Sequence, residues 1–188
     1  MPRYDIMPLN HGGATPLVVE GRMNASETFE VGELVFLNDD GEVEEFPQDA
    51  SEALVADADS GVIFGIATGG PSDVTARNIN PDTGVAYTTG DRVSFWRAGN
   101  PGQLWITDNY FATAHGAAAT PPGTIVGEAL QVGYSTTAAA WGLSIDAATE
   151  GTDIVCRVTA VLDSQKDPIS ATDTTNGVWV VFEMDGRA

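Results

Sequence analysis

The stretch Thr28–Gly70 opens with Glu30-Val31-Gly32-Glu33-Leu34-Val35-Phe36 and closes with Gly61-Val62-Ile63-Phe64-Gly65-Ile66-Ala67. The same pattern occurs a second time. Thr88–Phe95 again has an apolar run after Gly and an acidic residue, and Gly123–Ala129 again has an apolar run divided by an inner Gly. Repeats are sought first because a missed repeat mis-assigns the whole fold. Chance similarity in a Gly- and Val-rich β protein also explains two copies, so an internal duplication and chance both remain open.

Short apolar runs separated by turn signals predict strands throughout the first two thirds of the chain. Leu34–Leu37 is a continuous apolar run, which predicts a strand buried on both faces. Asp40-Gly41 follows it and predicts a hairpin turn, because Gly accepts the positive φ that such a turn needs. Val93–Arg97 and Gln103–Thr107 predict a second hairpin. Further expected elements are a buried strand over Val62–Ala67, a strand over Thr124–Val132, and a short helix or loop over Ala50–Ala58.

The last third of the chain alternates between apolar and polar residues. This period of two is typical of half-buried antiparallel strands. The apolar faces are expected to be Trp141, Leu143 and Ile145; Ile154, Cys156, Val158, Ala160 and Leu162; and Val178, Val180, Phe182 and Met184.

Together these patterns predict an all-β fold, an antiparallel barrel or sandwich of short strands with an extended N-terminal arm. We expect an arm over residues 1–24, a barrel or sandwich of two similar units over 25–133, and a C-terminal hairpin region or small lobe over 134–188. Pro and Gly residues break any regular element in the arm until Pro16-Leu17-Val18-Val19. That run is expected to bind a partner by adding a strand, either to this domain or to a neighbouring sheet.

The chain of 188 residues is strongly acidic, with a formal net charge of −19 and only eight basic residues. Such a surface repels nucleic acid and anionic membranes, so neither is expected as a partner. No apolar stretch approaches the roughly 18 residues of a membrane span, and the N-terminus lacks the pattern of a signal peptide. The single cysteine, Cys156, excludes an internal disulfide framework.

No constellation of residues indicates an enzyme, and we expect no catalytic residues and no cofactor. The sequence contains neither a phosphate-binding Gly-x-x-x-x-Gly-Lys loop nor a Gly-x-Ser-x-Gly elbow. His11 and His115 stand in Gly-rich segments and are interpreted as loop residues. Cys156 lies in an alternating strand and is interpreted as a small buried hydrophobe. Asp57–Gly61 loosely resembles the start of a calcium loop, but Thr68 stands where the bidentate Glu is needed, so a solvated acidic turn is the simpler interpretation.

Four tryptophans raise two alternatives for a binding surface, and sequence alone does not separate them. Trp179 is out of phase with the apolar residues around it, which indicates either a second core layer or a subunit interface, and the interface is the preferred interpretation. An aromatic platform for carbohydrate is the rival interpretation, made of Trp96, Trp105, Trp141 and Trp179.

The N-terminal half resembles the small head decoration, or capsid cement, proteins of tailed bacteriophages. The resemblance rests on Ala14-Thr15-Pro16-Leu17-Val18-Val19, Val31-Gly32-Glu33-Leu34-Val35, Asp40-Gly41-Glu42-Val43 and Gly61-Val62-Ile63-Phe64-Gly65-Ile66-Ala67. It covers about Ala14–Gly70 and, through the repeat, about Tyr87–Gly133. The chain is longer than the smallest decoration proteins, and residues 134–188 match nothing in that group.

The resemblance implies a non-catalytic structural protein of the virion, made in the host cytoplasm and placed on the outer capsid surface. It implies self-association, as a homotrimer at three-fold positions, and binding to the major capsid protein so that neighbouring capsomers are clamped together. The arm, Pro2–Val19, would add to the capsid protein's sheet. The alternatives are another non-catalytic phage part, such as a tail or spike β domain, and a carbohydrate-binding β-sandwich.

Overall fold

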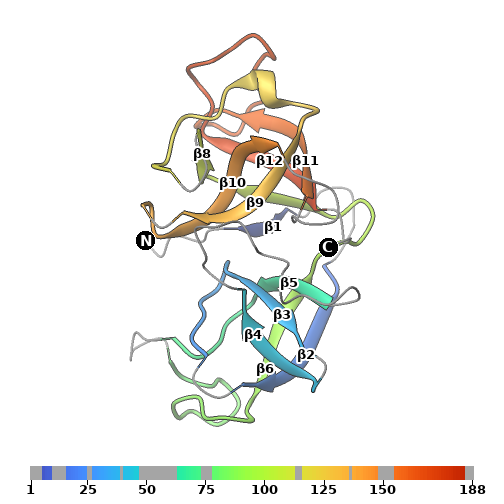
Figure 1. Cartoon of the computed structure of the whole chain (residues 1–188), viewed down its shortest axis with the longest axis vertical. Coiled ribbons are helices and arrows are strands. Elements are labelled where there is room, and N and C mark those ends of the chain that lie inside the picture. Colours follow the sequence, from blue (N-terminus) through green and yellow to red (C-terminus); the bar gives the residue numbers. More distant parts are fainter. Residues whose placement is uncertain are drawn as a thin grey trace.

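A computed structural model describes residues 6–9, 16–24, 27–38, 40–46, 63–72, 78–112, 116–135, 137–147 and 155–184. These residues form a closed five-stranded barrel and an open seven-stranded sheet, which follow one another along the long axis of the molecule (Figure 1). The expected all-β fold is therefore confirmed. The only helical element in the described ranges is a single 3-10 turn, η1 (Gly123–Ile125). Within the same ranges no long apolar helix of the kind that crosses a membrane is found.

The barrel is built from five short strands in the order β2-β4-β3-β5-β6. Neighbouring strands are antiparallel, apart from the parallel pair β2 and β4. The strands are β2 (Val18–Met23), β3 (Leu34–Leu37), β4 (Glu42–Glu45), β5 (Ile63–Ala67) and β6 (Arg92–Arg97).

The open sheet has the order β1-β7-β12-β11-β9-β10-β8. Its first strand comes from the N-terminus and pairs with β7, and its last pair, β10 and β8, is parallel. The strands are β1 (Met7–Leu9), β7 (Leu104–Thr107), β8 (Tyr110–Phe111), β9 (Ala129–Ser135), β10 (Ala140–Ala147), β11 (Val155–Leu162) and β12 (Trp179–Met184).

The expected hairpin between β3 and β4 is confirmed. Gly41 has a φ of +76°, and its N–H donates to the carbonyl of Asn38 at 3.0 Å. The side-chain Oδ1 of Asn38 accepts two further backbone hydrogen bonds, from Asp40 at 3.0 Å and from Glu42 at 2.9 Å. The side chain of Asn38 therefore stabilises the turn through hydrogen bonds to the turn's own backbone, as Asn commonly does at such positions.

Two hydrophobic cores explain the continuous apolar runs. The barrel interior is filled by Met23, Phe29, Val35, Val43, Ala67, Val93 and Phe95. A second, larger core joins the barrel to the open sheet, and these two parts are called the two layers below. This core contains Leu34, Phe64 and Ile66 of the barrel together with Trp105 and Trp141 of the open sheet. Leu34 and Val35 are both fully buried, one in each core, which confirms the expectation that β3 is buried on both faces.

The alternation predicted for β11 holds only along its first half. Cys156 and Val158 are buried as expected, but the next buried residue is Val161, while Ala160 and Leu162 are only half-buried. The pairing with β12 shifts between Val158 and Ala160, so one extra residue is accommodated there. A β-bulge of this kind moves the following side chains to the opposite face, which reverses the predicted phase. In β12 the alternation is confirmed for Val180, Phe182 and Met184, whereas Val178 precedes the strand and is 37% exposed.

The predicted hairpin of Val93–Arg97 with Gln103–Thr107 is wrong. β6 pairs with β2 and β5 in the barrel, whereas β7 pairs with β1 and β12 in the open sheet. The turn between them contains Gly99 and Gly102, with φ of +75° and +77°, and carries the chain from one layer to the other. A local turn signal cannot tell a hairpin from such a crossing, because the partner strands lie far away in the sequence.

The opening segments that repeat in the sequence take similar structures, because Gly32 (φ +98°) precedes β3 and Gly90 (φ +86°) precedes β6, whereas the closing segments differ. Ile63–Ala67 is a barrel strand, whereas Gly123–Ile125 is the 3-10 turn η1, and the strand expected over Thr124–Val132 begins only at Ala129. The expected domain division after residue 133 falls inside β9, which pairs with β10 and β11. The barrel takes β2 to β6, and the open sheet takes β1 together with β7 to β12. Ala50–Ala58 lies outside the described residues.

Candidate functional site

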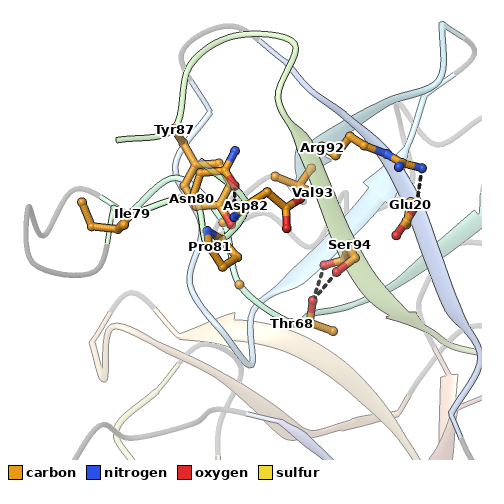
Figure 2. Close-up of a pocket in the computed structure, with 12 residues that line it drawn as sticks. Glu20, Thr68, Ile79, Asn80, Pro81, Asp82, Tyr87, Arg92, Val93 and Ser94 are labelled. Carbon is orange, nitrogen blue, oxygen red and sulfur yellow. Dashed lines mark hydrogen bonds and ion pairs between the residues drawn. The ribbon is translucent and has the colours of Figure 1, made fainter. Parts of the chain in front are cut away.

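A polar pocket of about 420 Å³ lies on the barrel, between the loop of residues 78–91 and the outer side of β6 (Figure 2). Figure 2 shows Tyr87, Pro81 and Asp82 on the loop side and Arg92 and Ser94 on the strand side. This volume is within the range of ordinary ligand pockets, whose smallest members have volumes of about 300 Å³.

Asn80 organises the loop wall of this pocket. It is 3% exposed, and its backbone N–H donates to the carbonyl of Val85 at 2.8 Å while its own carbonyl accepts from Gly84. Its side-chain Oδ1 accepts the N–H of Asp82 at 2.9 Å. Each hydrogen-bonding group of this buried residue thus fixes a neighbouring part of the loop.

Asp91 closes the loop at the start of β6. Its Oδ2 accepts the backbone N–H of Thr88 at 2.9 Å. This hydrogen bond, assisted by one from the side chain of Asn80, holds the pKa of the Asp91 carboxyl below its usual value. The charged carboxylate is therefore part of the loop's hydrogen-bond network.

The strand wall carries the polar side chains of β2, β5 and β6. Arg92 of β6 forms an ion pair with Glu20 of β2 across the barrel surface. Next to them the hydroxyl of Thr68, just after β5, donates to the carbonyl of Ser94 at 2.8 Å and lies 2.6 Å from its hydroxyl. The wall therefore presents a guanidinium, a carboxylate and hydroxyls.

The pocket also contains an ionisable phenol, that of Tyr87. Burial, followed by the negative charges of Asp82 and Asp91, raises the pKa of the Tyr87 phenol above its usual value of 10.0. The phenol therefore stays protonated near neutral pH, and the described residues that line the pocket include neither His nor Cys. Across the described residues, no group of three or more His, Cys, Asp or Glu side chains is placed to hold a metal ion.

The run Pro16–Val19, expected to add a strand either to this domain or to a neighbouring sheet, pairs within the chain. Val18 and Val19 are the first residues of β2 and pair with Trp96 and Phe95 of β6. The carbonyl of Leu17 accepts the N–H of Arg97 at 2.7 Å. The outward side chains of Leu17 and Val18 nevertheless remain 49% and 50% exposed.

The four tryptophans do not form a common surface. Trp105 and Trp141 are completely buried, and Trp96 packs against the core that joins the two layers. Trp179, the interface candidate, is half-buried at the start of β12, and Lys166 Nζ lies 5.4 Å from the centre of its ring. The structure thus removes Trp105 and Trp141 from any carbohydrate platform.

The remaining sequence candidates are a buried thiol and residues that the structure does not describe. Cys156 is completely buried, and burial raises the pKa of its thiol far above the usual value, as expected of a small core residue. His11, His115 and Asp57–Gly61 lie outside the described residues.

The sequence interpretation missed the pocket. The polar composition of residues 71–84 by itself indicates only a loop. Asn80-Pro81-Asp82 is a recognisable turn signal, but nothing in it indicates that the loop folds back against β6. Comparison with known proteins finds no matching protein-family model and no matching curated protein.

Proposed function

We propose that the protein is a structural component of a phage virion, which binds the outer surface of an icosahedral capsid and stabilises contacts between capsomers. The observation that carries the proposal is the place of the decoration-like motifs in the fold. Residues 31–35, 40–43 and 63–67 all contribute to β3, β4 and β5, three adjoining strands of the closed barrel. The resembling segments therefore form one continuous piece of structure.

The surface and charge of the protein support a binding role. Val18 is 50% exposed and pairs with the half-buried Trp96 of β6, and Leu17, just before it in the chain, is 49% exposed. Exposed aliphatic side chains next to an aromatic ring are common in protein interfaces. We assign this patch, Leu17, Val18 and Trp96, as the capsid contact. This patch takes the place of the strand that the sequence predicted to add to a capsid sheet, because the backbone of β2 already pairs with β6 within the chain.

Co-sedimentation with mature capsids stripped of their decoration protein tests the proposal. We expect saturation at a fixed symmetric number of copies per capsomer, and a trimer mass for the bound form. Copies bound are counted from the pelleted protein at several salt concentrations. A protein that remains in the supernatant under all conditions would exclude the capsid function, and assembly into rings or tubes would favour a tail protein.

A matched pair of variants tests the assigned contact. Val18→Glu places a charge in the patch, whereas Val126→Glu places the same charge at a similarly exposed valine, 41% exposed, beside η1 in the open-sheet layer. We expect Val18→Glu to weaken capsid binding at least about tenfold and Val126→Glu to leave it unchanged. Equal binding by both variants would move the contact away from Leu17, Val18 and Trp96.

A further inference from the structure

We propose that the pocket between the loop of residues 78–91 and β6 binds an uncharged saccharide ring. This inference goes beyond the structural function proposed above and does not depend on it. It rests on two facing walls of different chemistry, one partly apolar and one rich in hydrogen-bonding groups (Figure 2).

The loop wall offers flat and apolar surface. The Tyr87 ring is half-buried and packs against the barrel core, so its orientation is fixed. Pro81 and Ile79 continue the wall, and Ile79 is 46% exposed. A sugar ring has faces of C–H groups that can pack on such a surface, and a rigid aromatic side chain gives this contact at a small entropic cost.

The strand wall, together with Asp82, offers both donors and acceptors. Asp82 and Glu20 carry carboxylates that accept hydrogen bonds, Arg92 carries a planar group of donors, and Ser94 carries a hydroxyl. Each sugar hydroxyl is at once a donor and an acceptor. Two adjacent hydroxyls therefore match the paired oxygens of a carboxylate or the paired N–H groups of a guanidinium.

The charges of the pocket favour a neutral ligand over an ion. Two carboxylates, Asp82 and Glu20, and one guanidinium, Arg92, line it, and the Asp91 carboxylate lies close enough to act on Tyr87. This surplus of negative charge repels phosphates and sulfates. A small cation gains little from Glu20, because that carboxylate is already paired with Arg92. A neutral polyol is not repelled and loses no charge hydration on binding.

The pocket is also formed in advance of binding. The hydrogen bonds of Asn80 to Asp82, Gly84 and Val85, and that of Asp91 to Thr88, order the loop internally. Two backbone hydrogen bonds with Met23 of β2, from the N–H of Gly90 at 3.0 Å and to the carbonyl of Asp91 at 2.8 Å, hold its end to the barrel. A site whose loop is already ordered binds more tightly than one that must order it. We therefore expect a dissociation constant of about 1 mM for a single sugar ring.

Saturation-transfer NMR with the full chain tests the inference. The probes are glucose, galactose, mannose and N-acetylglucosamine, with their common disaccharides, and the comparison ligands are a sulfated sugar, inorganic phosphate and free arginine. We expect transfer to at least one neutral sugar and a saturable dissociation constant. Absence of transfer to every neutral sugar, or stronger binding of a charged comparison ligand, would overturn the inference.

Variants locate the binding. Asp82→Asn changes an exposed carboxylate of the pocket, and Arg92→Gln changes an exposed donor on the opposite wall. We expect each to weaken sugar binding about tenfold, the usual effect of losing a hydrogen bond to a charged group. Asp167→Asn removes the same charge from an exposed turn of the other layer and should bind like the wild type. If Asp82→Asn and Arg92→Gln bind like Asp167→Asn while their thermal unfolding is unchanged, the pocket is not the sugar site.

Discussion

Gly65 shows how one residue without a side chain decides the closure of the barrel. A Cβ atom at this position would lie 1.9 Å from the carbonyl oxygen of Trp96 on the neighbouring strand β6. Real Cβ atoms do not approach a backbone oxygen so closely, so any side chain here would push β5 and β6 apart. The inner Gly of the sequence motif thus reflects close packing of two strands.

Gly65→Ala should therefore lower the free energy of unfolding by about 3 kcal/mol, the cost of severe overpacking. Gly69→Ala is the matched control, because a Cβ there meets nothing within 4 Å. Urea unfolding of both variants measures the difference. Equal stabilities would mean that β5 and β6 separate at little cost.

Asp91 makes the stability of the fold depend on pH. Its pKa in the folded protein lies below its ordinary value of 3.8, because Thr88 and Asn80 donate hydrogen bonds to the charged form. The unfolded state therefore binds a proton at a higher pH than the folded state does. It follows that Asp91 stabilises the fold above its ordinary pKa and that this contribution is lost as the pH falls through the lowered value.

We expect Asp91→Asn to flatten the acid side of the curve of unfolding free energy against pH, between about pH 5 and pH 2. Asp167→Asn, which removes a carboxylate from a turn in the other layer, serves as the control variant. Urea midpoints measured at a series of pH values give the two curves. An unchanged acid slope in Asp91→Asn would show that the hydrogen bonds from Thr88 and Asn80 do not favour the charged form.

Among the strands, β1 is short, and one large buried side chain next to it, that of Ile6, holds it in place. Ile6, just before it, is completely buried in the core that joins the two layers. Its N–H donates to the carbonyl of Gly32 at 3.2 Å, while the strand itself pairs with β7. The segment thus connects the barrel with the edge of the open sheet.

Ile6→Ala should cost about 2–5 kcal/mol of stability, as expected for a large side chain removed from a core. The loss of protection from hydrogen exchange should be greatest in β1 and β7. Leu17→Ala is the control, since half of that side chain is already in solvent. Retention of wild-type protection in β7 would show that β1 is held by its strand pairing and not by Ile6.

The elements also show what the sequence can predict and where it fails. The hairpin at Asn38–Glu42 and the double burial of Leu34 and Val35 were predictable, because they depend on residues close together in the chain. The separation of β6 from β7 was not, since β7 finds its partners in β1 and β12. The bulge after Val158 and the pocket beside Tyr87 could not be predicted from the sequence for the same reason. Each depends on the register or approach of a distant segment.

For the whole molecule, the decisive feature is that one core extends through both layers. Leu34, Phe64 and Ile66 of the barrel belong to the same cluster as Trp105 and Trp141 of the open sheet. Neither layer can lose its structure without exposing apolar surface of the other. The barrel and the sheet should therefore behave as one thermodynamic unit.

Differential scanning calorimetry should show a single transition, with calorimetric and van't Hoff enthalpies in agreement. Ile66→Ala, which removes apolar surface from the shared core, should shift the whole transition and not only a part of it. Two resolved peaks, or a shift confined to one of them, would show that the layers unfold separately.

The short outermost strands of the open sheet have a consequence for self-association. A fibre grows when unpaired backbone groups on one molecule continue a ladder on the next. The barrel is closed, and the open sheet ends in β1, which has three residues, and β8, which has two. The strands β1 and β8 themselves therefore offer few backbone groups for another copy to continue.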